Sequence, residues 1–168
     1  GEWEFNIGSD DGSRLTIDGT IVVDNDGLHG FRWRDGTITL DAGTYDIQVI
    51  YFERTGHEGL VLTWQGPSDA WEKIVPSSAL RPEVMQPPSS TDGGGLNASW
   101  YHVNVRDLDD VDWNAVPDHT STISSINWAS TRGALYNGGP TDRFALKAQA
   151  VITIPETGLT LQPNKLYL

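Results

Sequence analysis

The stretch GEWEFNIGSDDGSRLTIDG, residues 1–19, decides the fold, because two runs of alternating polarity stand on either side of one turn. Apolar and polar side chains alternate from Trp3 to Ile7 and again from Leu15 to Ile17, and Asp11-Gly12 lies between the runs. A period of two places one face of a strand on a core and the other toward solvent. An Asp-Gly pair is a common turn. We therefore predict two short strands joined at this turn.

The same pattern continues through the first part of the chain. The period of two recurs at residues 45–51 and 60–64. Turn pairs separate the runs: Asp18-Gly19, Asp26-Gly27, Asp35-Gly36 and Ala42-Gly43. No amphipathic helix is indicated, although residues 77–80 could form one short helical turn. The spacing is typical of an all-β, antiparallel sandwich or barrel.

Later segments divide the chain into three parts. Residues 1–85 form the first part, although prolines make its last 20 residues irregular. Residues 86–95 are rich in Pro, Ser and Gly and have the composition of a linker. Residues 96–168 resume β character, most clearly by alternation over 144–154. Within them we expect an acidic loop at 107–113, a turn at Thr157-Gly158 and a tail from residue 159 of unassigned role.

Composition excludes several classes of function. The 168-residue length fits one domain, and there is no cysteine for a disulfide, a thiolate metal site or a Cys nucleophile. No run approaches the roughly 20 apolar residues of a membrane span, so we expect no membrane insertion. The formal net charge of −12 disfavours nucleic acid as a partner. The acidic residues either form a solvated surface or bind calcium, which prefers oxygen ligands.

An ordered set of motifs across residues 8–67 resembles the PA14 domain family. The matching stretches are Gly8–Leu15, Ile17–Gly19, Val22–Gly27, His29-Gly30, Leu40–Tyr45, Tyr51–Glu53 and Leu62–Pro67. Gly95–Tyr101 and Phe144–Gly158 are similar to the opening part of the same family, so the usual order is inverted. Either one domain is circularly permuted, with residues 87–95 joining the old ends, or the chain spans two tandem copies. We favour one permuted domain, because the two halves are complementary.

The resemblance implies a calcium site at Asp10 and Asp11. In sugar-binding members this pair is joined by a cis peptide bond, and both carboxylates point at one calcium ion. Vicinal hydroxyls of a sugar complete the coordination of the ion. The alternative is a plain hairpin turn, because Asp11 precedes a glycine.

The resemblance also implies that further ligands come from a second loop at residues 54–60. We expect a side-chain oxygen of Glu58 and a carbonyl near Leu60 to bind the metal, while His57 and Gly59 contact the sugar. A solvated hairpin tip is the alternative. His29 is expected at the edge of the site.

Two kinds of residue nearby have competing interpretations. Trp33, and less so Phe31, could pack a ring on a sugar, whereas Trp64 fits the core. The clusters at 24–26 and 107–112 could each hold calcium, but an Asx turn and a solvated loop are favoured for them.

Enzyme signatures are weak: no carboxylate pair, nucleophile elbow, phosphate loop or zinc motif has the required spacing. The sequence therefore predicts a calcium-dependent lectin module that binds carbohydrate and is not an enzyme. We expect a monomeric module of a larger secreted or cell-surface protein, such as an adhesin or a glycosidase. The alternative is a structural or protein-interaction PA14 module that binds no sugar.

Overall fold

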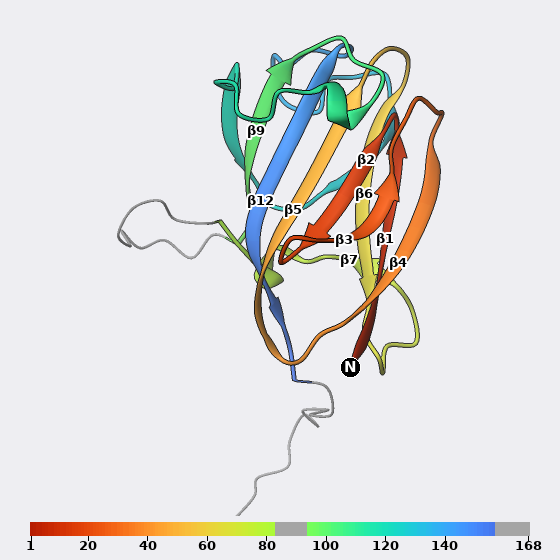
Figure 1. The fold of residues 1–168 in the computed structure, drawn as a ribbon, viewed down its shortest axis with the longest axis vertical. Coiled ribbons are helices and arrows are strands. Elements are labelled where there is room, and N and C mark those ends of the chain that lie inside the picture. Colours follow the sequence, from red (N-terminus) through yellow and green to blue (C-terminus); the bar gives the residue numbers. More distant parts are fainter. Residues whose placement is uncertain (83–93, 157–168) are drawn as a thin grey trace, which may run out of the picture.

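Two antiparallel sheets pack face to face in the computed structural model of the chain, which describes residues 1–82 and 94–156 (Figure 1). One sheet has the order β11-β6-β1-β4, with β7 paired to β6. Its strands are β1 (Glu2–Asp10), β4 (Arg32–Thr39), β6 (Glu58–Gln65), β7 (Lys73–Ile74) and β11 (Asn127–Thr131). The predicted all-β, antiparallel sandwich is confirmed.

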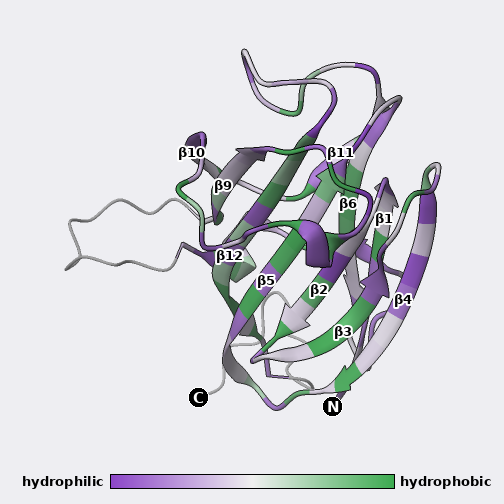
Figure 2. Ribbon diagram, turned by 45° about the horizontal axis from the view of Figure 1, so that its top comes forward, coloured by the Kyte–Doolittle hydropathy of each residue, from purple (hydrophilic) through white to green (hydrophobic). Residues whose placement is uncertain are grey.

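The second sheet has the order β10-β9-β12-β5-β2-β3, with β8 paired to β12. Its strands are β2 (Ser13–Ile17), β3 (Thr20–Asn25), β5 (Gly43–Glu53), β8 (Leu80–Arg81), β9 (Leu96–His102), β10 (His119–Ile123) and β12 (Phe144–Ile154). Strand β12 pairs with β5 over its whole length and with β9 on its other side. Hydrophobic and hydrophilic residues alternate along β5 and β12, as a strand with only one face on the core requires (Figure 2).

Helical structure in the described part of the chain consists of two 3₁₀ turns. The first, η1 (Ser77–Ala79), confirms the short helical turn predicted there. The second, η2 (Leu108–Asp110), lies in the acidic segment that we expected to be a loop. No helix in residues 1–82 or 94–156 is long and apolar enough to cross a membrane. The predicted linker, apart from Gly94 and Gly95, and the turn and tail from residue 157 lie outside the described residues.

A single large core lies between the sheets and draws on both parts of the chain. It includes Phe5, Ile7 and Leu62 from the first part, and Trp100 and Ile152 from the second. Each of these side chains is at most 1% exposed. Trp64, which we expected in the core, lies there too. Burial of this apolar surface is the dominant favourable contribution to such a fold.

A second, smaller cluster covers part of the outer face of the seven-stranded sheet. Leu108 and Val111 pack on Phe52 and Tyr101, whose side chains point away from the main core. Arg14 links β3 to the segment that contains Leu108 and Val111. Its guanidinium forms ion pairs at 3.2–3.4 Å with Asp24 and Asp26 on one side and with Asp109 on the other.

Candidate metal centre

The chain crosses from one sheet to the other at the corner formed by Asp10, Asp11 and Gly12. Strand β1 ends at Asp10 in one sheet and β2 begins at Ser13 in the other, so the corner is not a hairpin turn. The Asp10–Asp11 peptide bond is cis, as the resemblance implied. Gly12 is required here, because a Cβ atom would lie 2.4 Å from the Phe52 ring.

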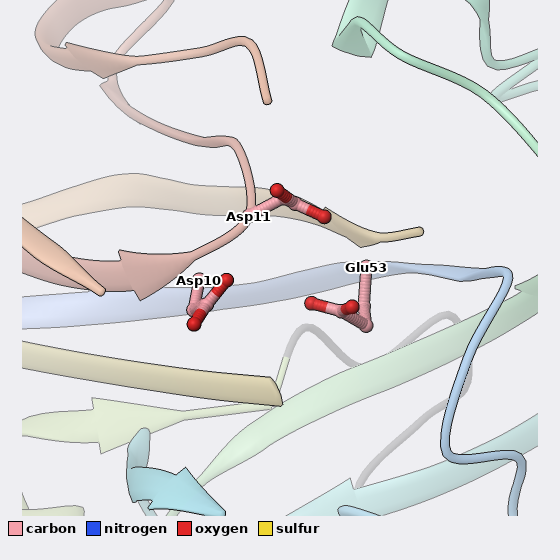
Figure 3. A group of neighbouring side chains, drawn as sticks. All are labelled: Asp10, Asp11 and Glu53. Carbon is pink, nitrogen blue, oxygen red and sulfur yellow. The ribbon is translucent and has the colours of Figure 1, made fainter. Parts of the chain in front are cut away.

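Three carboxylates meet at this corner (Figure 3). Asp10 and Asp11 come from the end of β1, and Glu53 is the last residue of β5. One oxygen from each side chain lies within 4.8 Å of the others. Asp10 and Asp11 are 9% and 6% exposed, and Glu53 is 1% exposed. We call these three residues the carboxylate triad.

Backbone N–H groups of the neighbouring loops hold the Asp11 carboxylate in place. The backbone N–H of His29 donates to Asp11 Oδ1, and that of Arg54 donates to Asp11 Oδ2, each at 3.0 Å. The backbone N–H of Phe31 lies near the Asp10 carboxylate and partly offsets the rise in its pKa that burial causes. The loops that follow β3 and β5 therefore orient the Asp11 carboxylate through its two oxygens.

The buried hydroxyl of Tyr51 joins the strands beneath the triad. It donates to the carbonyl oxygen of Asp10 and accepts from the backbone N–H of Gly59 at 3.4 Å. Because Tyr51 lies on β5, this hydroxyl connects β5 with β1 and β6, which are in the opposite sheet. The end of the sandwich that carries the triad is thereby fixed.

No hydrogen bond or ion pair within residues 1–82 and 94–156 compensates the charge of Glu53. Both of its oxygens are buried, and neither has a hydrogen-bond partner in this part of the chain. Burial, followed by repulsion from Asp11 and Asp10, raises the pKa of Glu53 to about 9. The backbone N–H of Asp11 lies close enough to offset this rise in part, but it does not meet hydrogen-bond geometry. Burial and the charge of Asp11 also raise the pKa of Asp10.

The triad thus requires either protons or a cation. Three buried carboxylates cannot all be ionised at low cost without positive charge between them. The donor set consists of oxygen alone, which suits hard ions such as Ca²⁺, Mg²⁺ and Mn²⁺ rather than ions that prefer nitrogen or sulfur. The residues present therefore fit a hard divalent cation.

Comparison with known proteins identifies the family of this part of the chain, since the family described as the PA14 domain matches residues 1–78. Residues 1–78 belong to a PA14 domain. The anti-sigma-I factor RsgI3 of Acetivibrio thermocellus is 33% identical over 100 residues, which are 59% of this chain. The chain spans only 15% of the length of that relative. No solved structure matches the chain at a significant level.

Glu58, the metal ligand predicted in the second loop, lies beside the triad of the PA14 domain. It is fully buried at the start of β6, and neither of its oxygens has a hydrogen-bond partner in the part of the chain that the structure describes. It is not among the residues grouped within 4.8 Å, and its pKa is raised by burial and by the charge of Asp142. Gly59 pairs with Asp10, and Leu60 lies farther along β6 between β1 and β11. Their roles as ligands remain predictions.

The other predicted contacts border the same end of the PA14 domain. His57 is exposed, and its Nε2 accepts from Arg132 Nε at 2.8 Å. The ring of His29 contacts the carbonyl oxygens of Asn25 and Gly30, while its backbone N–H bonds to Asp11 of the triad.

Trp33 lies on the outer face of the five-stranded sheet. It is 45% exposed and meets the Phe31 ring edge-on, with centroids 5.8 Å apart. Both rings cover Gly8, where a Cβ atom would lie 2.7 Å from Phe31. Phe31, which directly precedes β4, therefore packs on Gly8 of β1.

The two other acidic clusters have structural partners. The backbone N–H of Asp26 donates to Asp24 Oδ1 at 3.2 Å, which is the contact of an Asx turn. Asp26 in turn accepts from the backbone N–H of Leu108 at 3.1 Å. The backbone N–H of Asp109 donates to Asp107 Oδ1 at 2.9 Å, so Asp107 caps η2.

Glu53 is the member of the triad that the sequence analysis missed, although Tyr51–Glu53 was part of the motif. The signal was present in the alternation of β5, because Val49, Tyr51 and Glu53 share one parity and the first two lie in the core. A carboxylate at an inward position of a strand requires a partner.

Proposed function

We propose that this chain is a calcium-dependent carbohydrate-binding module whose ion is held by Asp10, Asp11 and Glu53. One observation carries the proposal: Glu53 is buried with no hydrogen-bond partner among the described residues, and its carboxylate lies beside those of Asp10 and Asp11. Calcium takes about 6–8 oxygen ligands, so the triad leaves positions for further oxygens. When bound, the ion would supply coordination positions for two vicinal hydroxyls of a sugar.

The surrounding residues have distinct proposed roles. Asp10 and Asp11 keep more exposure than Glu53, so the ligand approaches from their side. Glu58 and the carbonyl near Leu60 are further candidate ligands, and the exposed ring of His57 would hydrogen-bond a hydroxyl through its other nitrogen, Nδ1.

Trp33 is the candidate aromatic contact for the same ligand. Its half-exposed ring offers an apolar surface to the C–H face of a sugar. The edge of the site would thus combine hydrogen bonds with one apolar contact.

We further propose that the described residues form one PA14-type domain whose halves occur in permuted order. Two contacts support this. The amino group of Gly1 donates to the carbonyl oxygen of Leu40 at 2.7 Å, while Ile154 pairs with Gly43. The end of β12 and the start of β1 therefore lie at the same end of the sandwich, as joining them in the usual order requires (Figure 1). An extracellular location, in an adhesin or secreted enzyme, belongs to the same proposal.

A thermal-melt screen of monosaccharides, with calcium and with excess chelator, tests the proposed function. We expect calcium to raise the melting temperature and a subset of sugars to raise it further. Both effects should be lost with chelator and in Asp11→Asn, but kept in Glu2→Gln, which removes an exposed carboxylate far from the triad. Sugar binding that persists in excess chelator would contradict the proposal.

A second candidate function is that of a structural or protein-interaction module in which calcium only stabilises the fold. The near-complete burial of Glu53 favours it, because the triad connects the ends of β1 and β5 in opposite sheets. The same screen separates the two. A calcium-dependent rise in melting temperature that no sugar increases, together with a silent glycan array, identifies the structural role.

A further inference from the structure

Five uncharged polar side chains lie in line across the outer face of the seven-stranded sheet. The register places Thr122 opposite Asn97, Asn97 opposite Gln149, Gln149 opposite Gln48, and Gln48 opposite Thr16. The line crosses β10, β9, β12, β5 and β2 without interruption. We call these five residues the amide row.

The amide row faces away from the core. The neighbours of its members along the strands, Ala98, Ala148 and Val49, are buried between the sheets. Because successive side chains of a strand point to opposite faces, the row lies on the outer one. Thr122 and Asn97 are exposed, and the other three are half-buried.

Four of the five side chains of the row are available to a ligand. Thr122, Gln149, Gln48 and Thr16 form no side-chain hydrogen bond with the described residues. Some other polar side chains of this surface are used internally. Asp18, for example, accepts from the backbone N–H of Asp46 at 2.7 Å.

Each end of the row offers a further contact surface to an elongated ligand. A shallow hollow of about 340 Å³ lies at the β9–β10 end, lined by Asn97 to Ser99 and Thr120 to Thr122. At the other end Ile21, which is opposite Thr16, is 54% exposed. With strands about 4.8 Å apart, the five members span about 19 Å.

The chemistry of the row indicates a neutral ligand rich in hydroxyl groups. Side-chain amides both donate and accept hydrogen bonds, as sugar hydroxyls do. An acidic polymer would require Arg or Lys in the row, and none is present. The net charge of −12 would also repel such a polymer.

We propose that the amide row binds a neutral polysaccharide chain that runs across the strands, at a site separate from the metal centre. Gln48 lies five residues before Glu53 on β5, and the two side chains point to opposite faces of that strand. Five residues of a strand correspond to about 17 Å. Binding at the row therefore needs no metal, and the proposal does not depend on the proposed function of the triad.

Native affinity electrophoresis in excess chelator tests this site. Gels contain one of four soluble neutral polysaccharides with glucan, xylan, mannan or galactan backbones, or the carboxymethylated form of the glucan. We expect retardation of the unmodified protein by at least one neutral polysaccharide and none by the carboxymethylated glucan. Gln48→Val combined with Gln149→Val removes two amides but keeps β-forming side chains, and should weaken binding at least about tenfold.

The matched control is Thr44→Val combined with Thr153→Val. These residues are directly opposite each other on the same two strands and the same face, four positions from the row. The control should bind as the unmodified protein does. If circular dichroism shows that the Gln double variant is unfolded, Gln149→Thr alone replaces it, with at least about a threefold loss expected.

Three results would overturn the proposal. One is that no neutral polysaccharide retards the protein. Another is that the Gln variant binds as well as the control. The third is retardation that appears only with calcium, which would place the polysaccharide at the metal centre instead.

Discussion

Substitution of Glu53 by Gln should stabilise the protein in chelator but destabilise it in calcium. Burial and two neighbouring carboxylates raise the pKa of Glu53 to about 9, from a usual value of 4.5. A carboxyl whose folded-state pKa is raised favours the folded state below pH 4.5, and this advantage is lost progressively as the pH rises toward 9. At pH 7 without metal, keeping the proton costs about 3 kcal/mol, since each pKa unit corresponds to about 1.4 kcal/mol.

Gln has the shape of the protonated acid and requires no proton, so Glu53→Gln should recover most of this cost. For a chain of this size the gain corresponds to a rise of about 6–12 °C in melting temperature at pH 7 in chelator. The gain should nearly vanish at pH 5. In millimolar calcium the order reverses, because the unmodified protein gains binding free energy that the variant lacks.

Differential scanning calorimetry measures the melting temperature of each protein under four conditions, at pH 5 and pH 7 with calcium or with chelator. Glu2→Gln, at an exposed position, serves as the control and should change little in any of them. The reasoning fails if Glu53→Gln melts no higher than the unmodified protein in chelator at pH 7, or if calcium stabilises both proteins equally.

Two further substitutions test the packing of the sandwich, one at the site and one away from it. Tyr51→Phe removes the hydroxyl that links β5 to β1 and β6, and should cost about 1–3 kcal/mol by urea unfolding, because buried backbone groups lose their partner. Tyr45→Phe, whose hydroxyl is at an exposed turn, should cost at most about 0.5 kcal/mol, and equal costs would refute the role of Tyr51. Gly36→Ala places a Cβ atom 1.8 Å from the carbonyl oxygen of Val22 and should cost about 3 kcal/mol or more. Gly30→Ala, where a Cβ atom would have no described atom within 4 Å, should be nearly neutral in the same assay, and similar free energies of unfolding for the two Ala variants would contradict this packing.

The fold class could be predicted from the sequence because alternation with a period of two is a local property. The inward positions of β1 and β12, read from Trp3 to Ile7 and from Phe144 to Ile154, are the positions that the core uses. The assignment of strands to sheets could not be predicted. The runs on either side of Asp11-Gly12 are close in sequence, yet they lie in different sheets.

Only the part of the candidate site that is local in sequence could be predicted. Asp10 and Asp11 are adjacent in sequence, so the motif contains both. Glu53 joins them only because β5 pairs with β2 and ends at the corner where β1 stops. The amide row depends even more on register, since its five members come from five strands and a shift of one residue would turn a strand's side chain to the other face.

A crystal structure determined from calcium-containing buffer tests the central claim most directly. The account predicts a calcium ion with oxygens of Asp10, Asp11 and Glu53 at about 2.3–2.6 Å. It is contradicted if the map shows no ion among these three carboxylates and the Glu53 side chain is instead bonded to a protein group.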